Sequence, residues 1–345
     1  MTGTAHTEAL ERELAAQFGV RHAVAVASGT AALHTALAAL DLGPGDDVLV
    51  PALSVVMSVA PVIHAGARPI FVDCTPDGTD FDHDDLATKI TAATRAILPV
   101  HLWGRVGDSV RLLRLARRYG VDVVEDACQA QGTQVGGRHA GTFGTIGCFS
   151  MKDGKVLWSG EGGYLLTDRD DLYAYARSFR SHHQPPYPGV RATRPGHNYR
   201  LAEPLAAVAR ANLARFDALL ARRRRQAGLL RELLSGTPGI EVVDVSAEQQ
   251  WNGYSLLASV TLPAPRAFCE HLARQGVPNS VGTFRLVPAD RQPVFAGLPT
   301  TPCRNAAAVV DRTLAVVLND HDHDGRLDRY AKTIIREARR WHRPC

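Results

Sequence analysis

The sequence has little lysine, few aromatic residues and no long apolar run. Four of its 39 basic residues are lysine, and aromatic residues make up 6% of the 345 residues. Basic and acidic residues nearly balance, at 39 and 35, so we expect no nucleic-acid partner. No stretch of about 18 apolar residues occurs, so we expect no membrane span. The 45% hydrophobic and 21% charged residues exclude a disordered or collagen-like chain.

Metal-binding and targeting signals are also missing. The six cysteines form no CxxC pair and no zinc-ligand spacing. His182-His183 and 320–323 (DHDH) lack further ligands nearby, so we interpret both as solvated loops and expect no metal site. Residues 1–14 have neither a basic region nor a long apolar segment, which predicts no signal peptide and a cytoplasmic location.

Short apolar strands alternate with helical patterns through the first half of the chain. This alternation predicts an α/β fold whose mostly parallel sheet is covered by helices on both faces. After Gly147, two strand-like runs on either side of 160–163 (GEGG) indicate an antiparallel addition. The expected strands are 22–27, 47–50, 69–73, 96–100 and 122–125, and the expected helices are 10–18, 28–40, 54–64, 82–90 and 106–119.

The second half predicts a smaller domain. A loop rich in proline, histidine and arginine (181–197) precedes one long helix at about 203–235, with Pro204 in its tolerated first turn. The segments beyond it are a strand at 254–262 and helices at 265–275, 305–314 and 325–341. We therefore expect a large domain at 1–217 and a small α+β domain at 218–345, joined by the long helix.

Three strand ends carry residues that could bind a ligand, because ligands of open α/β sheets bind at the carboxyl ends of strands. The first is 28–31 (SGTA), a turn of small residues that opens a helix. Its free N–H groups and the helix dipole suit a phosphate. Ordinary helix capping by Ser28 explains the same residues.

The second strand end carries two carboxylates, Glu125 and Asp126. A carboxylate in an apolar setting needs a partner, and a protonated heterocyclic nitrogen would serve as one. A structural cap for the next turn is the alternative.

The third strand end carries Lys152 and Lys155, followed by 160–163 (GEGG). A lysine among apolar residues can have a lowered pKa and attack an aldehyde as a nucleophile. A surface lysine is the ordinary alternative, although this chain has few lysines elsewhere.

A phosphate cradle, an acid for a pyridinium nitrogen and an amine for an aldehyde are the three anchors of pyridoxal 5′-phosphate (PLP). With these motifs in this order, the sequence resembles the DegT/DnrJ/EryC1/StrS family of fold-type-I, PLP-dependent sugar and cyclitol aminotransferases. The resemblance covers most of the chain from about Leu10. It is carried by 28–33 (SGTAAL), 99–104 (PVHLWG), 125–130 (EDACQA), 150–163 and 196–200 (GHNYR).

The resemblance assigns roles to individual residues. Lys155 matches the Schiff-base lysine, and Lys152 is its only rival. Asp126 would pair with the pyridinium N–H, and Gln129 would contact the phenolic oxygen of the ring. The phosphate would be held by Gly29, Thr30, Ala31 and Ser150, and by Asn198 from the neighbouring subunit. A homodimer with shared active sites is therefore expected.

The resemblance also implies the reaction. An amino group would pass from glutamate or glutamine to a keto cyclitol or keto sugar, in secondary-metabolite biosynthesis of the antibiotic type. The segments 154–157 (GKVL) and 159–163 (SGEGG) are closer to the cyclitol and aminohydroxybenzoate branch than to the nucleotide-sugar branch.

Several positions depart from the family pattern. Val55 stands where the family has an aromatic residue over the ring, and Trp158 stands where it has threonine. The chain before the first helix is also shorter, so we expect a more open pocket or substrate contacts from elsewhere. The substrate pocket is expected to include Val55, His101, Trp158 and Glu161. These departures leave two alternatives open, another PLP reaction (elimination, aldol or cyclisation) and a non-catalytic member of the family.

Overall fold

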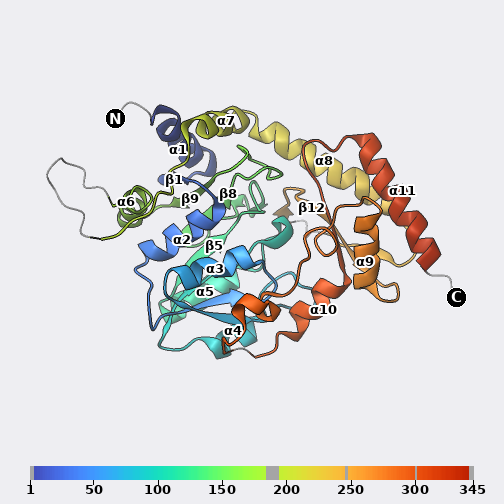
Figure 1. Ribbon diagram of the computed structural model, residues 1–345, viewed down its shortest axis with the longest axis horizontal. Helices are drawn as coiled ribbons and strands as arrows, with labels where there is room; N and C mark the ends of the chain where they lie inside the picture. The colour runs from blue at the N-terminus through green and yellow to red at the C-terminus, as the bar shows by residue number, and fades with distance from the viewer. Residues whose placement is uncertain (1–3, 184–193, 245–247, 300, 342–345) are drawn as a thin grey trace.

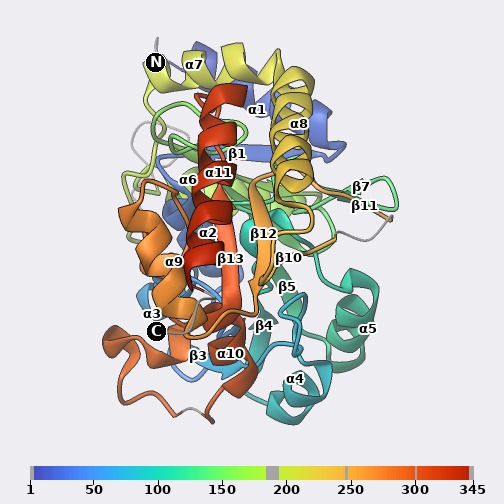
Figure 2. The ribbon, with the colours of Figure 1, turned by 90° about the vertical axis from the view of Figure 1, so that its right-hand side faces the viewer.

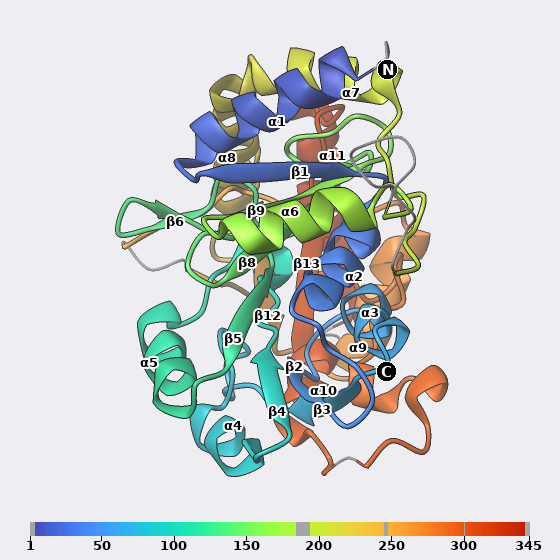
Figure 3. The same cartoon turned by 90° about the vertical axis from the view of Figure 1, so that its left-hand side faces the viewer.

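A seven-stranded sheet lies at the centre of the computed structural model (Figure 3). The structure describes residues 4–183, 194–244, 248–299 and 301–341. The strand order is β1-β9-β8-β5-β4-β2-β3. Strands β3, β2, β4, β5 and β8 are parallel, and β9 pairs antiparallel with β8 and β1. The mostly parallel sheet and its antiparallel addition are as predicted. The strands are β1 (His22–Val26), β2 (Asp47–Pro51), β3 (Arg68–Val72), β4 (Thr94–Ile97), β5 (Asp122–Asp126), β8 (Ile146–Ser150) and β9 (Gly163–Thr167).

Helices cover both faces of this sheet because its strands are apolar on both sides. In β2, Val48 and Val50 pack in one core cluster while Leu49 packs in another with Leu86 and Leu112. This alternation is expected of a strand with helices above and below. The covering helices are α1 (Ala5–Phe18), α2 (Gly29–Ala39), α3 (Val56–His64), α4 (His83–Lys89), α5 (Ser109–Tyr119), α6 (Asp170–Phe179) and α7 (Glu203–Leu213).

The C-terminal part has its own antiparallel sheet, in the order β10-β12-β13, beside which α8, α9 and α11 lie (Figure 2). In Figure 1 these helices form the yellow to red side of the molecule. The division between domains at residue 217 stays a prediction. The elements are α8 (Phe216–Leu234), β10 (Ile240–Val242), β12 (Ser255–Val260), α9 (Pro265–Arg274), α10 (Arg304–Arg312), β13 (Thr313–Val317) and α11 (Asp324–Trp341).

Short elements complete the fold. A strand from the C-terminal half, β11, returns to pair with β6, so the two halves of the chain are interleaved here. These elements are η1 (Leu102–Gly104), β6 (Gln134–Val135), β7 (Arg138–His139), β11 (Gln249–Gln250), η2 (Ala289–Arg291) and η3 (Pro293–Phe295). In the described ranges, no helix has the length and apolar character needed to cross a membrane.

Two expected elements differ from the structure. The single helix at 203–235 is wrong, since α7 ends at Leu213 and α8 begins at Phe216. Arg215 leaves the helical conformation at φ −117°, and its guanidinium donates to Asn212 Oδ1 at 2.7 Å. The helix expected at 305–314 ends at Arg312, because the β-branched run that follows pairs with β12. Of the loop expected at 181–197, residues 184–193 lie outside the described residues.

Candidate active site

A cavity of about 580 Å³ lies at the carboxyl ends of the central strands, between them and the C-terminal part. Its walls come from the segments after β2, β4, β5 and β8 on one side, and from residues near β12 and β13 on the other. Ligands of open α/β sheets bind at the carboxyl ends of the strands, so the cavity lies where the sequence predicts a ligand.

Most of the expected site residues meet at this cavity. Two do not: Ala31 is buried within α2, and Asn198 is exposed on the chain's surface away from the cavity walls. The expected residues that line the cavity are Gly29, Thr30, Val55, His101, Asp126, Gln129, Ser150, Lys155, Trp158 and Glu161.

The Lys155 amine lies 3.5 Å from the hydroxyl of Tyr254 and 5.1 Å from the centroid of its ring. Burial lowers the pKa of Lys155, while Tyr254, Cys128 and Asp126 raise it, and the balance raises this pKa above its usual value. The lowered pKa expected from an apolar setting is therefore wrong for the protein without cofactor. The polar neighbours, which come from distant parts of the chain, outweigh the burial.

The Asp126 carboxylate is fixed from two sides. Ser58 Oγ donates to Oδ2 at 2.6 Å, and the backbone N–H of Cys128 donates to Oδ1 at 3.1 Å. The carboxylate is buried and still lines the cavity. Such a fixed, buried carboxylate fits a partner that carries a positive N–H, as the ring nitrogen of PLP does. The sequence reasoning missed Ser58, which looks like an ordinary helical serine.

The segment 28–30 forms a cradle against the end of β8. Ser28 caps α2 by accepting the N–H of Ala31 at 3.1 Å, so the capping interpretation is correct. The N–H groups of Gly29 and Thr30 precede the first intrahelical bond. A Cβ on Gly29 would lie 2.8 Å from both Cys128 Sγ and Ser150 Cβ. The close approach of α2 to the end of β8 thus needs glycine at position 29. It leaves the N-terminus of α2 facing the cavity, and this helix N-terminus fits a phosphate.

Gln129 lines the cavity while its side chain supports the neighbouring loop. Its Oε1 accepts the N–H of Trp103 at 2.7 Å, and its carbonyl accepts the amide of Asn252 at 2.8 Å. Trp103 has a positive φ of 57°, which is costly for a bulky residue. Gln129 therefore stabilises a strained turn as well as facing the cavity.

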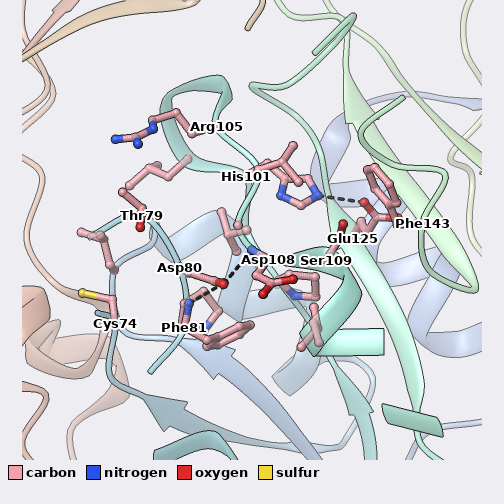
Figure 4. Close-up of a pocket in the computed structure, with 18 of the residues that line it drawn as sticks. Cys74, Thr79, Asp80, Phe81, His101, Arg105, Asp108, Ser109, Glu125 and Phe143 are labelled. Carbon is pink, nitrogen blue, oxygen red and sulfur yellow. Dashed lines mark hydrogen bonds and ion pairs between the residues drawn. The ribbon is translucent and has the colours of Figure 1, made fainter. Parts of the chain in front are cut away.

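His101 forms a buried pair with Glu125, its Nε2 lying 2.8 Å from Oε2 (Figure 4). Glu125 also accepts the N–H groups of Gly141 and Gly144, at 2.8 and 2.6 Å. Glu125 thus holds the loop before β8 in place, whereas the expected cap of the next turn comes from Asp126, whose Oδ1 accepts the N–H of Cys128. Of the two carboxylates at this strand end, Asp126 alone lines the large cavity.

Figure 4 shows a second, smaller cavity of about 50 Å³, which shares His101 with the first. Asp80, one of the carboxylates that line it, accepts the N–H of Asp108 at 2.7 Å and lies 2.9 Å from Nε2 of His83. Lys155 does not line this cavity. Its polar groups hold loops together, and we do not assign it a catalytic role.

Three further residues of the large cavity come from the C-terminal half. Arg223, Tyr254 and Asp320 line it, and Trp158 Nε1 donates to Asp320 Oδ2 at 2.9 Å. Nothing in their local sequence marks them, because only the fold brings them to Lys155. Among the described residues, no group of three His, Cys, Asp or Glu side chains is arranged to hold a metal.

Comparisons with known proteins assign the chain to the same family as the sequence motifs do. A sequence profile of the DegT/DnrJ/EryC1/StrS aminotransferase family matches residues 1–334. A UDP-N-acetyl-3-dehydro-alpha-D-glucosamine 3-aminotransferase of Acidithiobacillus ferrooxidans is 34% identical over 334 residues, which cover 96% of this chain and 88% of that protein.

A cyclitol enzyme is also similar. The L-glutamine:2-deoxy-scyllo-inosose aminotransferase of Streptomyces kanamyceticus is 38% identical over 243 residues, which cover 66% of this chain and 57% of that protein. Among solved structures, DesV of S. venezuelae superposes with a TM-score of 0.86 at 31% identity, covering 96% of this chain and 89% of DesV.

Proposed function

Because the chain belongs to the DegT/DnrJ/EryC1/StrS family and is a PLP-dependent aminotransferase of fold type I, we propose that it aminates a keto cyclitol or keto sugar. The amino donor is glutamate or glutamine, and the product enters secondary-metabolite biosynthesis of the antibiotic type. The observation that carries the proposal is that Lys155, Asp126 and the cradle at Gly29 line one cavity.

Each of these residues has a role in the proposal. Lys155 binds the aldehyde carbon of the cofactor, and Asp126 accepts a hydrogen bond from its ring N–H. Bound PLP supplies an electron sink for the negative charge that develops on a carbon losing its proton. Once the amine of the donor has displaced Lys155 from that carbon, the free Lys155 Nζ would accept the proton from the α-carbon of the donor and return it at the cofactor side.

The remaining expected residues complete the site. The N–H groups of Gly29 and Thr30 and the hydroxyl of Ser150 bind the phosphate. Gln129 contacts the phenolic oxygen. Val55, His101, Trp158 and Glu161 face the acceptor. Their presence on the cavity walls supports this arrangement.

The assembly is proposed to be a homodimer with shared sites. Asn198 is exposed and lies outside this chain's own cavity, which is what a residue that reaches the partner's phosphate requires. We also propose a cytoplasmic location. The five cysteines within the described residues are free thiols, which suits a reducing compartment.

The acceptor is proposed to be a free cyclic ketone of the cyclitol type. Two observations support it: the segments 154–157 (GKVL) and 159–163 (SGEGG), and the 38% identity to an enzyme named for 2-deoxy-scyllo-inosose. The 34% identity to a UDP-sugar aminotransferase over a longer stretch favours the nucleotide-sugar alternative.

The test offers both acceptors to purified enzyme with PLP and glutamine. Free 2-deoxy-scyllo-inosose and a nucleotide-linked 3-keto sugar are incubated separately, and the amine product is measured by mass spectrometry. Amination of the free ketone supports the proposal. Amination of the nucleotide-linked sugar alone would contradict the cyclitol preference and leave the sugar alternative. Lys155→Ala is the control for uncatalysed condensation.

A further inference from the structure

A buried network of three side chains lies beside Lys155. Trp158 Nε1 donates to Asp320 Oδ2 at 2.9 Å, and Arg223 Nε lies 3.1 Å from Asp320 Oδ1. The Arg223 side chain is 0% exposed and that of Asp320 is 13% exposed. All three residues line the large cavity. A charge pair this deeply buried is costly unless its partners are well placed.

Arg223 connects this network to the backbone of Lys155. Its Nη2 donates to the carbonyls of Gly154 at 3.0 Å and Lys155 at 3.4 Å, while Nη1 donates to the carbonyl of Leu318. The guanidinium therefore ties the Lys155 turn to the segment 318–320 that follows β13.

The same segment also reaches the side chain of Lys155. The N–H of Leu318 donates to the carbonyl of Tyr254 at 3.4 Å, and the hydroxyl of Tyr254 lies 3.5 Å from Lys155 Nζ. The segment 318–320 thus supports both ends of Lys155, the backbone through Arg223 and the amine through Tyr254.

The charges in this region are balanced by Asp320. Burial lowers the pKa of Arg223, and Asp320, Tyr254 and Asp322 raise it. The groups that face Lys155 are Tyr254, Cys128 and Asp126. If Asp320 were made neutral, the buried guanidinium near Lys155 would lose the carboxylate 3.1 Å from its Nε and, among the described residues, keep only Asp322 as an acidic neighbour. A nearby positive charge disfavours the protonated form of an amine.

We propose that Asp320 is a positioning residue that, through Arg223 and Trp158, holds the Lys155 turn and sets the pH at which the cofactor linked to Lys155 changes its protonation. This inference rests on the proposed function, in which Lys155 binds PLP. It assigns to Trp158 the task of orienting Asp320 through the hydrogen bond between them.

The test is a pH titration of the visible absorbance of PLP-loaded protein. For Asp320→Asn, which keeps the shape and the acceptor for Trp158, we expect the midpoint to fall by about one pH unit. The matched control is Asp324→Asn at the start of α11, whose side chain is 72% exposed and 4.0 Å from Arg225. Its midpoint should equal that of the unmodified protein.

Two further variants separate charge from structure. The double variant Asp320→Asn/Arg223→Gln removes both charges, so its midpoint should return toward that of the unmodified protein. Trp158→Phe keeps the ion pair and should leave the midpoint in place while weakening PLP binding about threefold. The affinity is measured by titrating apo-protein with PLP.

The outcomes of these experiments distinguish a failure of the role proposed for Asp320 from a failure of the proposed function. A Lys155-dependent band whose midpoint is the same in Asp320→Asn and Asp324→Asn would overturn the role of Asp320 alone. Lower thermal stability of Asp320→Asn without a shift would do the same, because it indicates a purely structural role. No band that depends on Lys155 in the unmodified protein would overturn both.

Discussion

Ser58 Oγ donates a 2.6 Å hydrogen bond to Oδ2 of Asp126, joining the first turn of α3 to the end of β5. Both side chains are buried. A hydroxyl bonded to a carboxylate fixes the orientation of that carboxylate. The orientation of the Asp126 carboxylate thus depends on Ser58, which lies 68 positions earlier in the sequence.

Ser58→Ala should weaken PLP binding about tenfold, because a hydrogen bond to a charged group contributes about 1.5 kcal/mol. Affinity is measured by titrating the apo-protein with PLP. The control is Ser54→Ala, another buried serine, whose hydroxyl donates to the carbonyl of Pro51. Equal losses in the two variants would show that Ser58 acts through local stability only.

Gly29→Ala should lower PLP affinity more than tenfold, because a Cβ there would meet Cys128 and Ser150 at 2.8 Å and push α2 away from the end of β8. The same titration measures it, together with the melting temperature of the apo-protein. Gly43→Ala is the matched control, since its Cβ would meet nothing within 4 Å. Undiminished affinity in Gly29→Ala would place the phosphate elsewhere.

Val55→Tyr should tighten PLP binding about two- to tenfold, because an aromatic pair adds roughly 0.5–1.5 kcal/mol beyond burial. Val55 lines the cavity, at the position where the family resemblance predicts an aromatic residue. The exposed Val110, at 65%, provides the control Val110→Tyr. Weaker binding by Val55→Tyr would indicate that the ring does not lie against this position.

His34 makes folding sensitive to acid. Its Nδ1 lies 3.0 Å from the hydroxyl of Tyr199, and burial, together with His197 and His64, lowers its pKa to about 4. The unfolded chain, with a pKa near 6.5, binds the proton first as the pH falls. The contribution of His34 to the free energy of unfolding is therefore constant above pH 6.5. It falls between pH 6.5 and 4, by about 2–3 kcal/mol.

The check is the melting temperature as a function of pH. His34→Gln cannot titrate, so its melting temperature should fall less steeply between pH 6.5 and 4 than that of the unmodified protein. His321→Gln, at an exposed position, should follow the unmodified curve. Identical slopes for all three proteins would contradict the role of His34.

The sequence predicted the elements whose signals are local. Ser28 before a run of small residues predicted the start of α2, and alternating apolar strands and helices predicted the central sheet. The break in the long helix was missed because it depends on the side-chain contact of Arg215 with Asn212. Helix propensity alone favours continuation there.

The site was predictable where residues follow strand ends, as Asp126, Ser150 and Lys155 do. Tyr254 and Arg223 were not, because they approach Lys155 from elements about 70 to 100 positions later in the chain. The wrong direction for the pKa of Lys155 has a similar cause, since Tyr254, Cys128 and Asp126 approach it only in the folded chain. Local sequence shows its apolar neighbours but not the polar groups that the fold adds.

Measurements of visible absorbance test whether Lys155 binds PLP and transfers amino groups. Purified protein with PLP is scanned before and after excess glutamate or glutamine, beside Lys155→Ala and the control Lys152→Ala. We expect a visible band that needs Lys155 but not Lys152, and that bleaches when the donor is added. A band that persists with every donor, or that survives in Lys155→Ala, would contradict this role of Lys155.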